Sequence, residues 1–464
     1  MSDVLTLNGN VLINNGNALT ISGVGPAEVE EKQINFIDYD GTLLYSYTKT
    51  EINAMTSESE LPRNPSHTGL TAQGWNWTLA QIKAQLTALP DGPVWVGQMY
   101  TTTSGATEID VEFDDANYLS PYLCICPNGT VTIDWGDGSA TGELTGTSVS
   151  SRKYLQHTYS SVGKYTIKLT TTNKIGFSAS STSYPGILKV SNVEDNTRYN
   201  ATYAQLIKAV RFGNGASASS GSGFARLYNL ETVTIPSNID GPNYLYFGSD
   251  YSLKCVVFPN TATSIYGGAC DSTYSLERVS LPATITAIGS STFSYSKLAS
   301  ITIPSGSTIS NTALSYCYSL RSLYLPSSVT SLSDTLTASC KILNNISYSS
   351  ITSIGNSVFS NLHSMTSVTI PNTVTSMGNY NFYYCYSLKS ITIPSSVETI
   401  GTYFCSYSYA IEELHMLPTT PPTLGANAFK SIASFFKIYV PSASLTAYQT
   451  ADGWSDFASY MVGE

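Results

Sequence analysis

Ile391-Thr-Ile-Pro394 is one copy of a short unit, apolar-x-apolar-Pro, that recurs along the second half of the chain. Other clear copies are Val233-Thr-Ile-Pro236, Val279-Ser-Leu-Pro282, Ile301-Thr-Ile-Pro304 and Val368-Thr-Ile-Pro371. The prolines follow one another at 22 to 24 residues, apart from one interval of 45 that holds a degenerate copy, Ile346-Ser-Tyr-Ser349. A fixed period of this length is the sequence pattern of a solenoid.

Each unit contains more than a strand. A Thr/Ser-rich stretch follows the proline and ends in Ile-Gly, as in Val397-Glu-Thr-Ile-Gly401, and a segment such as Cys385-Tyr-Ser-Leu388 leads into the next strand. One unit cannot bury its own apolar face, but stacked units can. We therefore predict a solenoid over residues 206–441, with strands ending at the prolines, and a C-terminal cap over residues 442–464.

The full repeat, L-x-x-I-x-I-P-x-x-V-x-x-I-G-x-x-x-F-x-x-C, resembles the BspA-type leucine-rich repeat, a family first associated with bacterial surface proteins. The resemblance covers about half of the chain. It implies a leucine-rich-repeat solenoid that is displayed on a surface.

Residues 104–193 resemble a second family. Val131-Thr-Ile-Asp-Trp-Gly-Asp-Gly-Ser139 and the run from His157 to Leu169 are similar to the two signature strands of a PKD domain. That resemblance implies an immunoglobulin-like β-sandwich, in which His157 braces a strand. The residues agree, because Asp137-Gly138 is a turn dipeptide after an alternating strand.

Residues 34–103 form a small α+β module in our interpretation. Asp40-Gly41 predicts the turn of a hairpin, and Thr48-x-x-Glu51 and Thr78-x-x-Gln81 have the form of capping boxes that begin helices. The hairpin and the run Gly69–Trp77 resemble an N-terminal module of bacteriophage structural proteins. Residues 1–33 are expected to form a β-rich tip. The predicted fold class is therefore mainly β and multidomain: an α+β module, a PKD-like sandwich and a leucine-rich-repeat solenoid.

Composition excludes several partners. The net charge is −10, only 12% of the residues are charged, and Lys and Arg do not cluster, so we expect neither nucleic acid nor an anionic membrane as a partner. No stretch has the length of a membrane span, and the segment after Met1 lacks the pattern of a signal peptide. The eight Cys lack the C-x-x-C spacing of zinc sites, which predicts reduced structural thiols.

No catalytic motif stands out, and we expect no enzyme activity, no cofactor and no metal site. Acidic residues gather at two places, and two alternatives remain for them: a solvated acidic face with turn chemistry, or calcium ligands. These residues are Asp110, Glu112, Asp114, Asp115, Asp134 and Asp137.

Ligand binding is predicted on the strands of the solenoid. Residues between the buried apolar positions of successive strands line one continuous face. Its larger polar members are Arg278, Arg321, Tyr324 and Lys389. Cations suit acidic groups, and Tyr suits sugar or aromatic faces. The many other tyrosines of the repeats, such as Tyr380, serve either binding or packing.

These features favour a bacteriophage virion structural protein, of the tail or head fibre or decoration type, that displays its repeats for host recognition. Residues 1–100 would then contact other virion proteins, the chain could form a homotrimer, and the target would be a host-surface glycan or protein. The location would be the outer surface of the virion. The alternative is a bacterial cell-surface leucine-rich-repeat adhesin. A hydrolase would need a catalytic domain that the sequence does not show.

Overall fold

The computed structural model describes residues 33–177, 187–189, 205–218, 224–432 and 436–464, together with the backbone of three N-terminal strands. These strands, β1 (Leu5–Leu7), β2 (Asn10–Asn14) and β3 (Leu19–Ile21), pair antiparallel in chain order. The predicted β-structure of residues 1–33 is therefore present. The side chains of this segment lie outside the described residues.

The α+β module is built on one sheet of four strands in the order β5-β4-β7-β6. Their bounds are β4 (Ile34–Ile37), β5 (Leu43–Tyr47), β6 (Leu70–Trp75) and β7 (Val94–Thr102). Helices α1 (Lys49–Ala54) and α2 (Leu79–Ala88) both begin at the predicted capping boxes. The Glu51 amide donates to Thr48 Oγ1 at 3.1 Å, and the Thr48 amide donates to the Glu51 carboxylate at 2.7 Å. A 3-10 turn, Glu58–Glu60, lies between α1 and α2 in the sequence.

The next unit is all β, and its longest strand, β9, belongs to two sheets. β9 pairs with β10, β12 and β13 in one sheet and with β11 and β14 in the other. The elements are β8 (Thr107–Phe113), η2 (Ala116–Tyr118), β9 (Tyr122–Asp134), β10 (Gly142–Thr147), β11 (Lys153–Gln156), β12 (Gly163–Thr171), β13 (Lys174–Gly176) and β14 (Leu188–Lys189).

His157 has a structural environment in this unit. Its ring stacks on Trp135 with centroids 4.5 Å apart, and its Nε2 lies 2.8 Å from Asp137 Oδ2. Both contacts hold the ring against the buried core, as expected for a brace. The membership of this unit in the PKD family stays a prediction.

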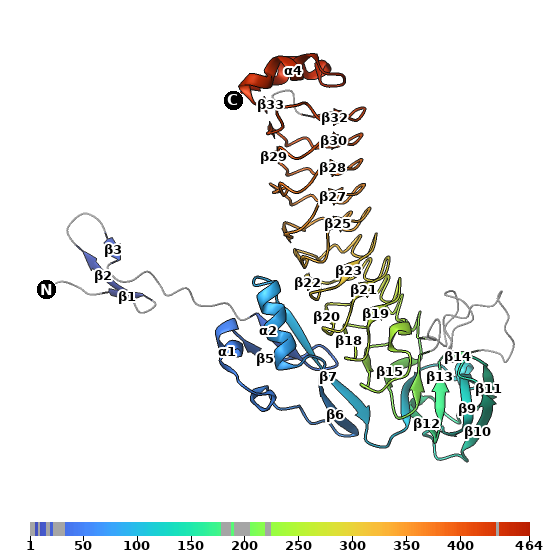
Figure 1. Cartoon of the computed structure of the whole chain (residues 1–464). Helices are drawn as coiled ribbons and strands as arrows, with labels where there is room; N and C mark the ends of the chain where they lie inside the picture. The colour runs from blue at the N-terminus through green and yellow to red at the C-terminus, as the bar shows by residue number, and fades with distance from the viewer. Residues whose placement is uncertain are drawn as a thin grey trace.

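The repeats form a column of stacked turns with two ladders of short parallel strands (Figure 1). We call the first ladder the strand face. Its members are β15 (Ile207–Arg211), β17 (Thr232–Thr234), β18 (Cys255–Val257), β20 (Arg278–Ser280), β22 (Ser300–Thr302), β24 (Ser322–Tyr324), β26 (Asn345–Ser347), β29 (Ser390–Ile393), β31 (Glu413–Met416), β33 (Lys437–Val440) and β34 (Met461–Gly463).

The second ladder lies on another side of each turn. Its members are β16 (Ala216–Ser217), β19 (Ser264–Ile265), β21 (Ala287–Ile288), β23 (Thr308–Ile309), β25 (Ser331–Leu332), β27 (Ser353–Ile354), β28 (Ser376–Met377), β30 (Thr399–Ile400) and β32 (Thr423–Leu424). A 3-10 turn, Pro242–Tyr244, precedes β19.

The predicted solenoid is confirmed, with local differences. Strands of the face end one or two residues before the repeat proline, because proline has no N–H to donate to the ladder. β20, for example, ends at Ser280 and β29 at Ile393. The copy at Val368 forms only an isolated bridge, between Thr369 and Thr392.

The cysteines stabilise the stacking of the turns. All eight are buried free thiols, as predicted. Within the repeats, the Sγ atoms of Cys317, Cys340 and Cys385 lie 3.0 to 3.1 Å from a carbonyl oxygen of an earlier turn. Burial raises the pKa of Cys385 to about 12, so its thiol stays protonated and can donate this hydrogen bond.

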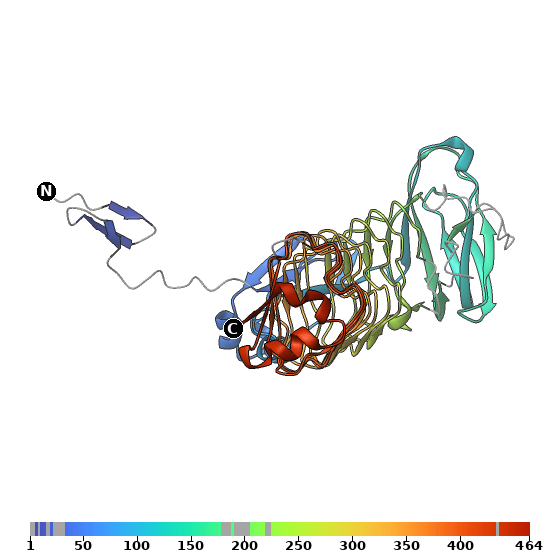
Figure 2. The same cartoon turned by 90° about the horizontal axis from the view of Figure 1, so that it is seen from above.

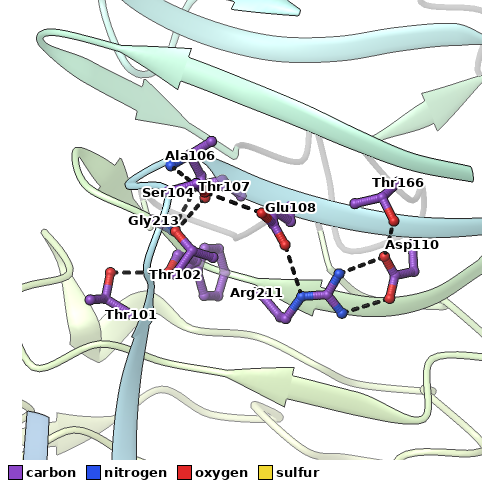
Figure 3. A network of polar contacts seen from close by, with 11 residues as sticks. Thr101, Thr102, Ser104, Ala106, Thr107, Glu108, Asp110, Thr166, Arg211 and Gly213 are labelled. Atoms are coloured by element: carbon purple, nitrogen blue, oxygen red, sulfur yellow. Dashed lines mark hydrogen bonds and ion pairs between the residues drawn. The ribbon is translucent and has the colours of Figure 1, made fainter. Parts of the chain in front are cut away.

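The first solenoid turn is continuous with the β-unit before it. β15 pairs with β8 and with β17, and β16 pairs with β13, so both ladders begin as strands of the preceding sheet. The Arg211 guanidinium donates to both oxygens of Asp110, each at 2.6 Å, and its Nε donates to Glu108 at 3.2 Å (Figure 3). This ion-pair network joins β15 to β8.

The last turn is closed by the C-terminal segment. β34 adds to β33, and η4 (Ser442–Ser444), α4 (Leu445–Thr450) and η5 (Ser455–Tyr460) cover the end of the column. Trp454 is fully buried and donates its indole N–H to the Pro422 carbonyl at 2.7 Å. Residues 442–464 thus cap the repeats, as expected. In the side view of Figure 1, the module and the β-unit lie at the first turns, at the opposite end of the column from this cap. In Figure 2, which looks along the column, the cap faces the viewer.

We expect Arg211→Ala to lower the free energy of unfolding by about 2 kcal/mol, because two carboxylates lose a shared, largely buried partner. Lys208→Ala is the matched control: it removes another β15 cation, whose Nζ lies 3.9 Å from Glu112, and should change stability by less than about 0.5 kcal/mol. Chemical denaturation measures both. Equal losses would contradict a special role for Arg211.

Candidate functional site

The outward side chains of the strand face form one row, which we call the outer row. Paired strands place these residues in register along the column, and they alternate with residues of the solenoid core. The row consists of Arg211, Thr234, Val257, Ser280, Thr302, Tyr324, Ser347, Thr369, Thr392, His415 and Tyr439.

The α+β module packs on the first part of this row. Strand β7 contacts β17, β18 and β20. A Cβ added to Gly97 would lie 2.4 Å from Val257 Cγ1 and 2.9 Å from Ser280 Cβ, and one added to Gly92 would lie 3.0 Å from Thr302. Backbones this close require the absence of a side chain, so glycine is needed at both positions.

Buried polar side chains fix the module in this place. Asn76 Nδ2 donates to the Phe258 carbonyl at 2.9 Å, and Trp77 Nε1 donates to the Leu281 carbonyl at 2.8 Å. From the solenoid, Ser280 Oγ donates to the Trp95 carbonyl at 2.6 Å. Carbonyls just beyond the strand ends thus accept side-chain bonds from the module, which satisfies groups that the contact buries.

These contacts divide the outer row. The module covers Val257, Ser280 and Thr302 and reaches Tyr324, since a Cβ added to Gly92 would lie 3.2 Å from Tyr324 Cβ; the row is open from Ser347 to Tyr439. The prediction that the whole strand face is a recognition surface is therefore wrong for its first part. The physical reason is that the module has glycine at Gly92, just before β7, and at Gly97 within it, where the row comes closest, so two backbones meet there.

A pocket of about 420 Å³ opens at the edge where the module ends. We call it the junction pocket. Module residues Trp77, Gln85, Pro93, Val94 and Trp95 form one wall. The solenoid supplies the other wall from four consecutive turns, with Glu277, Arg278, Val279, Leu281, Lys297, Ala299, Ser300, Ile301, Thr302, Pro304, Ser319, Arg321 and Ile342.

The charges of the junction pocket are predominantly positive. Lys297 Nζ lies 2.7 Å from Glu277 Oε1, and this hydrogen bond holds the pKa of Glu277 below its usual value, with Arg278 and Lys254 acting in the same direction. Arg321 is exposed at the rim, and its guanidinium has no hydrogen-bond or ion-pair partner among the described residues. Only Glu277 in the lining carries negative charge.

The four predicted ligand residues have different environments. Arg278 donates to the Gly41 carbonyl at 2.9 Å and lies over the Trp95 ring at 5.7 Å, so it holds the module in place and also lines the pocket. Arg321 lines the pocket, and Tyr324 lies at the edge of the module, beside Gly92. Lys389 is exposed on a later turn, outside the pocket. Whether they bind a ligand stays a prediction.

Sequence reasoning missed the module wall of the pocket. Trp77 and Trp95 lie outside the repeats, and their only signal in the sequence is that a small module holds three tryptophans, with Trp75 as the third, and glycines nearby. Sequence spacing cannot show that this module folds back on turns about 200 residues later.

The tyrosines outside the strand face form stacked columns. Tyr295 and Tyr316 stack with centroids 4.6 Å apart and planes 2° apart, and Tyr380 and Tyr403 stack at 5.1 Å and 4°. In such a column each ring covers the face of the next and presents mainly its edge to water. Of the two alternatives for these tyrosines, this geometry favours packing.

The acidic clusters have partners within the chain. Asp110 binds Arg211, while Asp134 and Asp137 accept backbone N–H groups of Gly136 and Ser139 at 2.9 and 3.0 Å. Over the residues that the structure describes, no group of three or more metal-ligating side chains occurs. In the same part of the chain no helix has the length and apolarity needed to cross a membrane.

The fold and the site together define a repeat protein of the leucine-rich type, a parallel β-solenoid that presents one long strand face. The model of the BspA type leucine rich repeat region matches residues 188–299, 218–344 and 338–451, in six copies. These matches cover more than half of the chain, and the chain belongs to this family.

Solved structures that resemble the chain are also leucine-rich repeat proteins. One from Bacteroides ovatus is 20% identical over 50% of this chain and 66% of its own, with a TM-score of 0.44. A leucine rich cell surface protein from Faecalibacterium prausnitzii is 22% identical over 45% and 73%, with a TM-score of 0.27. The T. pallidum leucine rich repeat protein is 25% identical over 37% and 72%, also at 0.27. This chain spans just under two thirds of the Bacteroides structure. No curated protein matches it.

Gly97→Ala should destabilise the docked module by about 1–3 kcal/mol, because the new methyl overlaps Val257. We expect the module to unfold at lower denaturant concentration, measured by chemical denaturation. We also expect faster cleavage within residues 34–103, measured by limited proteolysis.

The double variant Gly97→Ala with Val257→Ala is the matched test. Removing the valine methyls makes room for the added methyl, so part of the loss should be recovered. A single variant as stable as the native chain would contradict close backbone contact at this place.

Proposed function

We propose that this protein is a non-enzymatic surface-recognition protein, a cell-surface adhesin of the BspA-type leucine-rich-repeat class. The observation that carries the proposal is the open part of the outer row. It begins next to the pocket that the module completes, with Tyr324 at the edge of the module, and ends on two consecutive turns with the stacked pair His415 and Tyr439. Family membership adds support, since these repeats are associated with bacterial surface proteins.

The contacts of the histidine side chains are consistent with a protein that binds a partner without catalysing a reaction. The rings of His67, His157 and His415 contact carboxylates, those of Asp38, Asp137 and Glu464. None of these rings hydrogen-bonds a Ser, Thr or Cys side chain in the described part of the chain, so the pairing of a base with a nucleophile is not assembled there. Rigid aromatic and small hydroxyl groups on a solenoid face suit recognition.

A second candidate is a virion structural protein of a bacteriophage, of the fibre or decoration type, with its location on the outer surface of the particle. The resemblance of residues 34–103 to a phage module favours it. In this case residues 1–100 would attach the chain to other virion proteins. Recognition would still occur on the open row, with a host-surface glycan or protein as partner.

We expect the full chain, displayed on beads to multiply weak contacts, to bind cells that carry its target. The double variant His415→Ala with Tyr439→Ala removes a stacked pair from the open row, whose centroids lie 4.7 Å apart, and should weaken binding by about fivefold or more. Tyr274→Ala, which removes a ring that packs edge-on against Tyr295 outside the strand face, is the control and should bind like the native chain.

The measurement is bead adhesion to bacterial cells and to epithelial cells. Adhesion to epithelial cells supports the adhesin, and adhesion to bacteria alone supports the virion protein. No adhesion to either cell type, or equal loss in the control, would count against recognition by the open row.

A further inference from the structure

The junction pocket has unused hydrogen-bonding groups beside unused positive charge. The Ser300 and Ser319 hydroxyls are half-buried in its lining and have no hydrogen-bond partner among the described residues. Arg321, at the rim of the same pocket, has no partner either. Gln85, in contrast, is already satisfied, because its amide bonds the Ile303 carbonyl and the Ser305 N–H.

We propose that the junction pocket binds one carboxylate-bearing sugar residue of a surface glycan, with the Arg321 guanidinium holding the carboxylate. This inference rests on the proposed recognition function and names the ligand class for one part of it. It differs from the general expectation of a strand-face ligand, because the site requires both the module and the solenoid.

Charge selects the anion. Of the four charged residues in the lining, three are cations, and Lys297 already compensates Glu277. Among the residues that the structure describes, Arg278 and Arg321 form no ion pair with a carboxylate. A guanidinium offers parallel N–H groups that match the two oxygens of a carboxylate, which makes Arg321 suited to bind one in bidentate fashion.

Shape and neutral groups select a sugar. The volume of about 420 Å³ lies within the range of small-molecule sites and admits a sugar ring. Trp77, Pro93 and Trp95 form an apolar wall that can contact the C–H groups of the ring, while Ser300 and Ser319 can bond its hydroxyls from the opposite wall. Arg278 lies over Trp95, so the expected contact is with the edge of that indole.

The test is titration of the full chain with D-glucuronate, with D-glucose and with inorganic phosphate, followed by calorimetry or NMR. We expect saturable binding of glucuronate and much weaker binding of the other two. Arg321→Ala should weaken glucuronate binding about tenfold to a hundredfold, since a charge-assisted bond is lost. Arg321→Lys should recover only part, because an ammonium is not bidentate.

Lys389→Ala is the matched control. The Arg321 and Lys389 carbonyls each accept two amides of the following turn, those of Asn344 and Asn345 or of Glu412 and Glu413, so the two cations occupy equivalent repeat positions. Only Arg321 lies at the pocket, and Lys389→Ala should bind glucuronate normally. Ala299→Trp fills the pocket from an exposed position and should abolish binding without loss of stability.

The proposal is overturned if glucuronate does not bind, if phosphate or glucose binds as well as glucuronate, or if Arg321→Ala and Lys389→Ala behave alike. Cell adhesion of the same variants separates this failure from failure of the proposed function. Adhesion that persists in Arg321→Ala, together with absent glucuronate binding, refutes the pocket alone. If the native chain itself does not adhere to cells, the proposed recognition function is refuted.

Discussion

Each turn of a parallel β-solenoid bonds its backbone to the turn before and the turn after, so the first and last turns would leave strands with an unpaired edge. This chain satisfies both ends with its own segments. At the start, β8 and β13 of the preceding unit supply partners for β15 and β16, and at the end β34 pairs with β33. The bidentate contact of Arg211 with Asp110 lies at the first of these joints. The stacked turns between depend on both ends being closed.

The docked module adds a constraint of a different kind, because it precedes the β-unit in sequence and yet packs on the repeats that follow it. Contact is closest where Gly97 meets Val257 and Ser280 and where Gly92 meets Thr302 and the Cβ of Tyr324. Beyond Tyr324 the module ends and the row is free. The junction pocket results from this edge: neither the module nor the solenoid alone has both of its walls.

Features that depend on residues close together in the sequence could be predicted, whereas contacts between distant segments could not. The solenoid was predictable because each turn repeats one pattern, and the two capping boxes were predictable because Thr and Glu or Gln lie three residues apart. The role of Arg278 in holding the module was not predictable, since its hydrogen bond to Gly41 joins segments more than 200 residues apart. Ring stacking of Tyr295 on Tyr316 also depends on the path of the turns, which composition does not reveal.

The residues of the outer row change in size where the module ends. Under the module they are Val257, Ser280 and Thr302, which permit close backbone contact, and Tyr324 lies at the edge of the module, beside Gly92. At the far end of the row, His415 stacks on Tyr439. Small hydroxyl residues, Ser347 and Thr392, lie between these larger groups. Arg211, at the same position of the first turn, is equally large, but its partners are the carboxylates of β8. The size of a side chain on this row therefore follows what lies over it: carboxylates at the first turn, a backbone under the module, and open surface beyond the module.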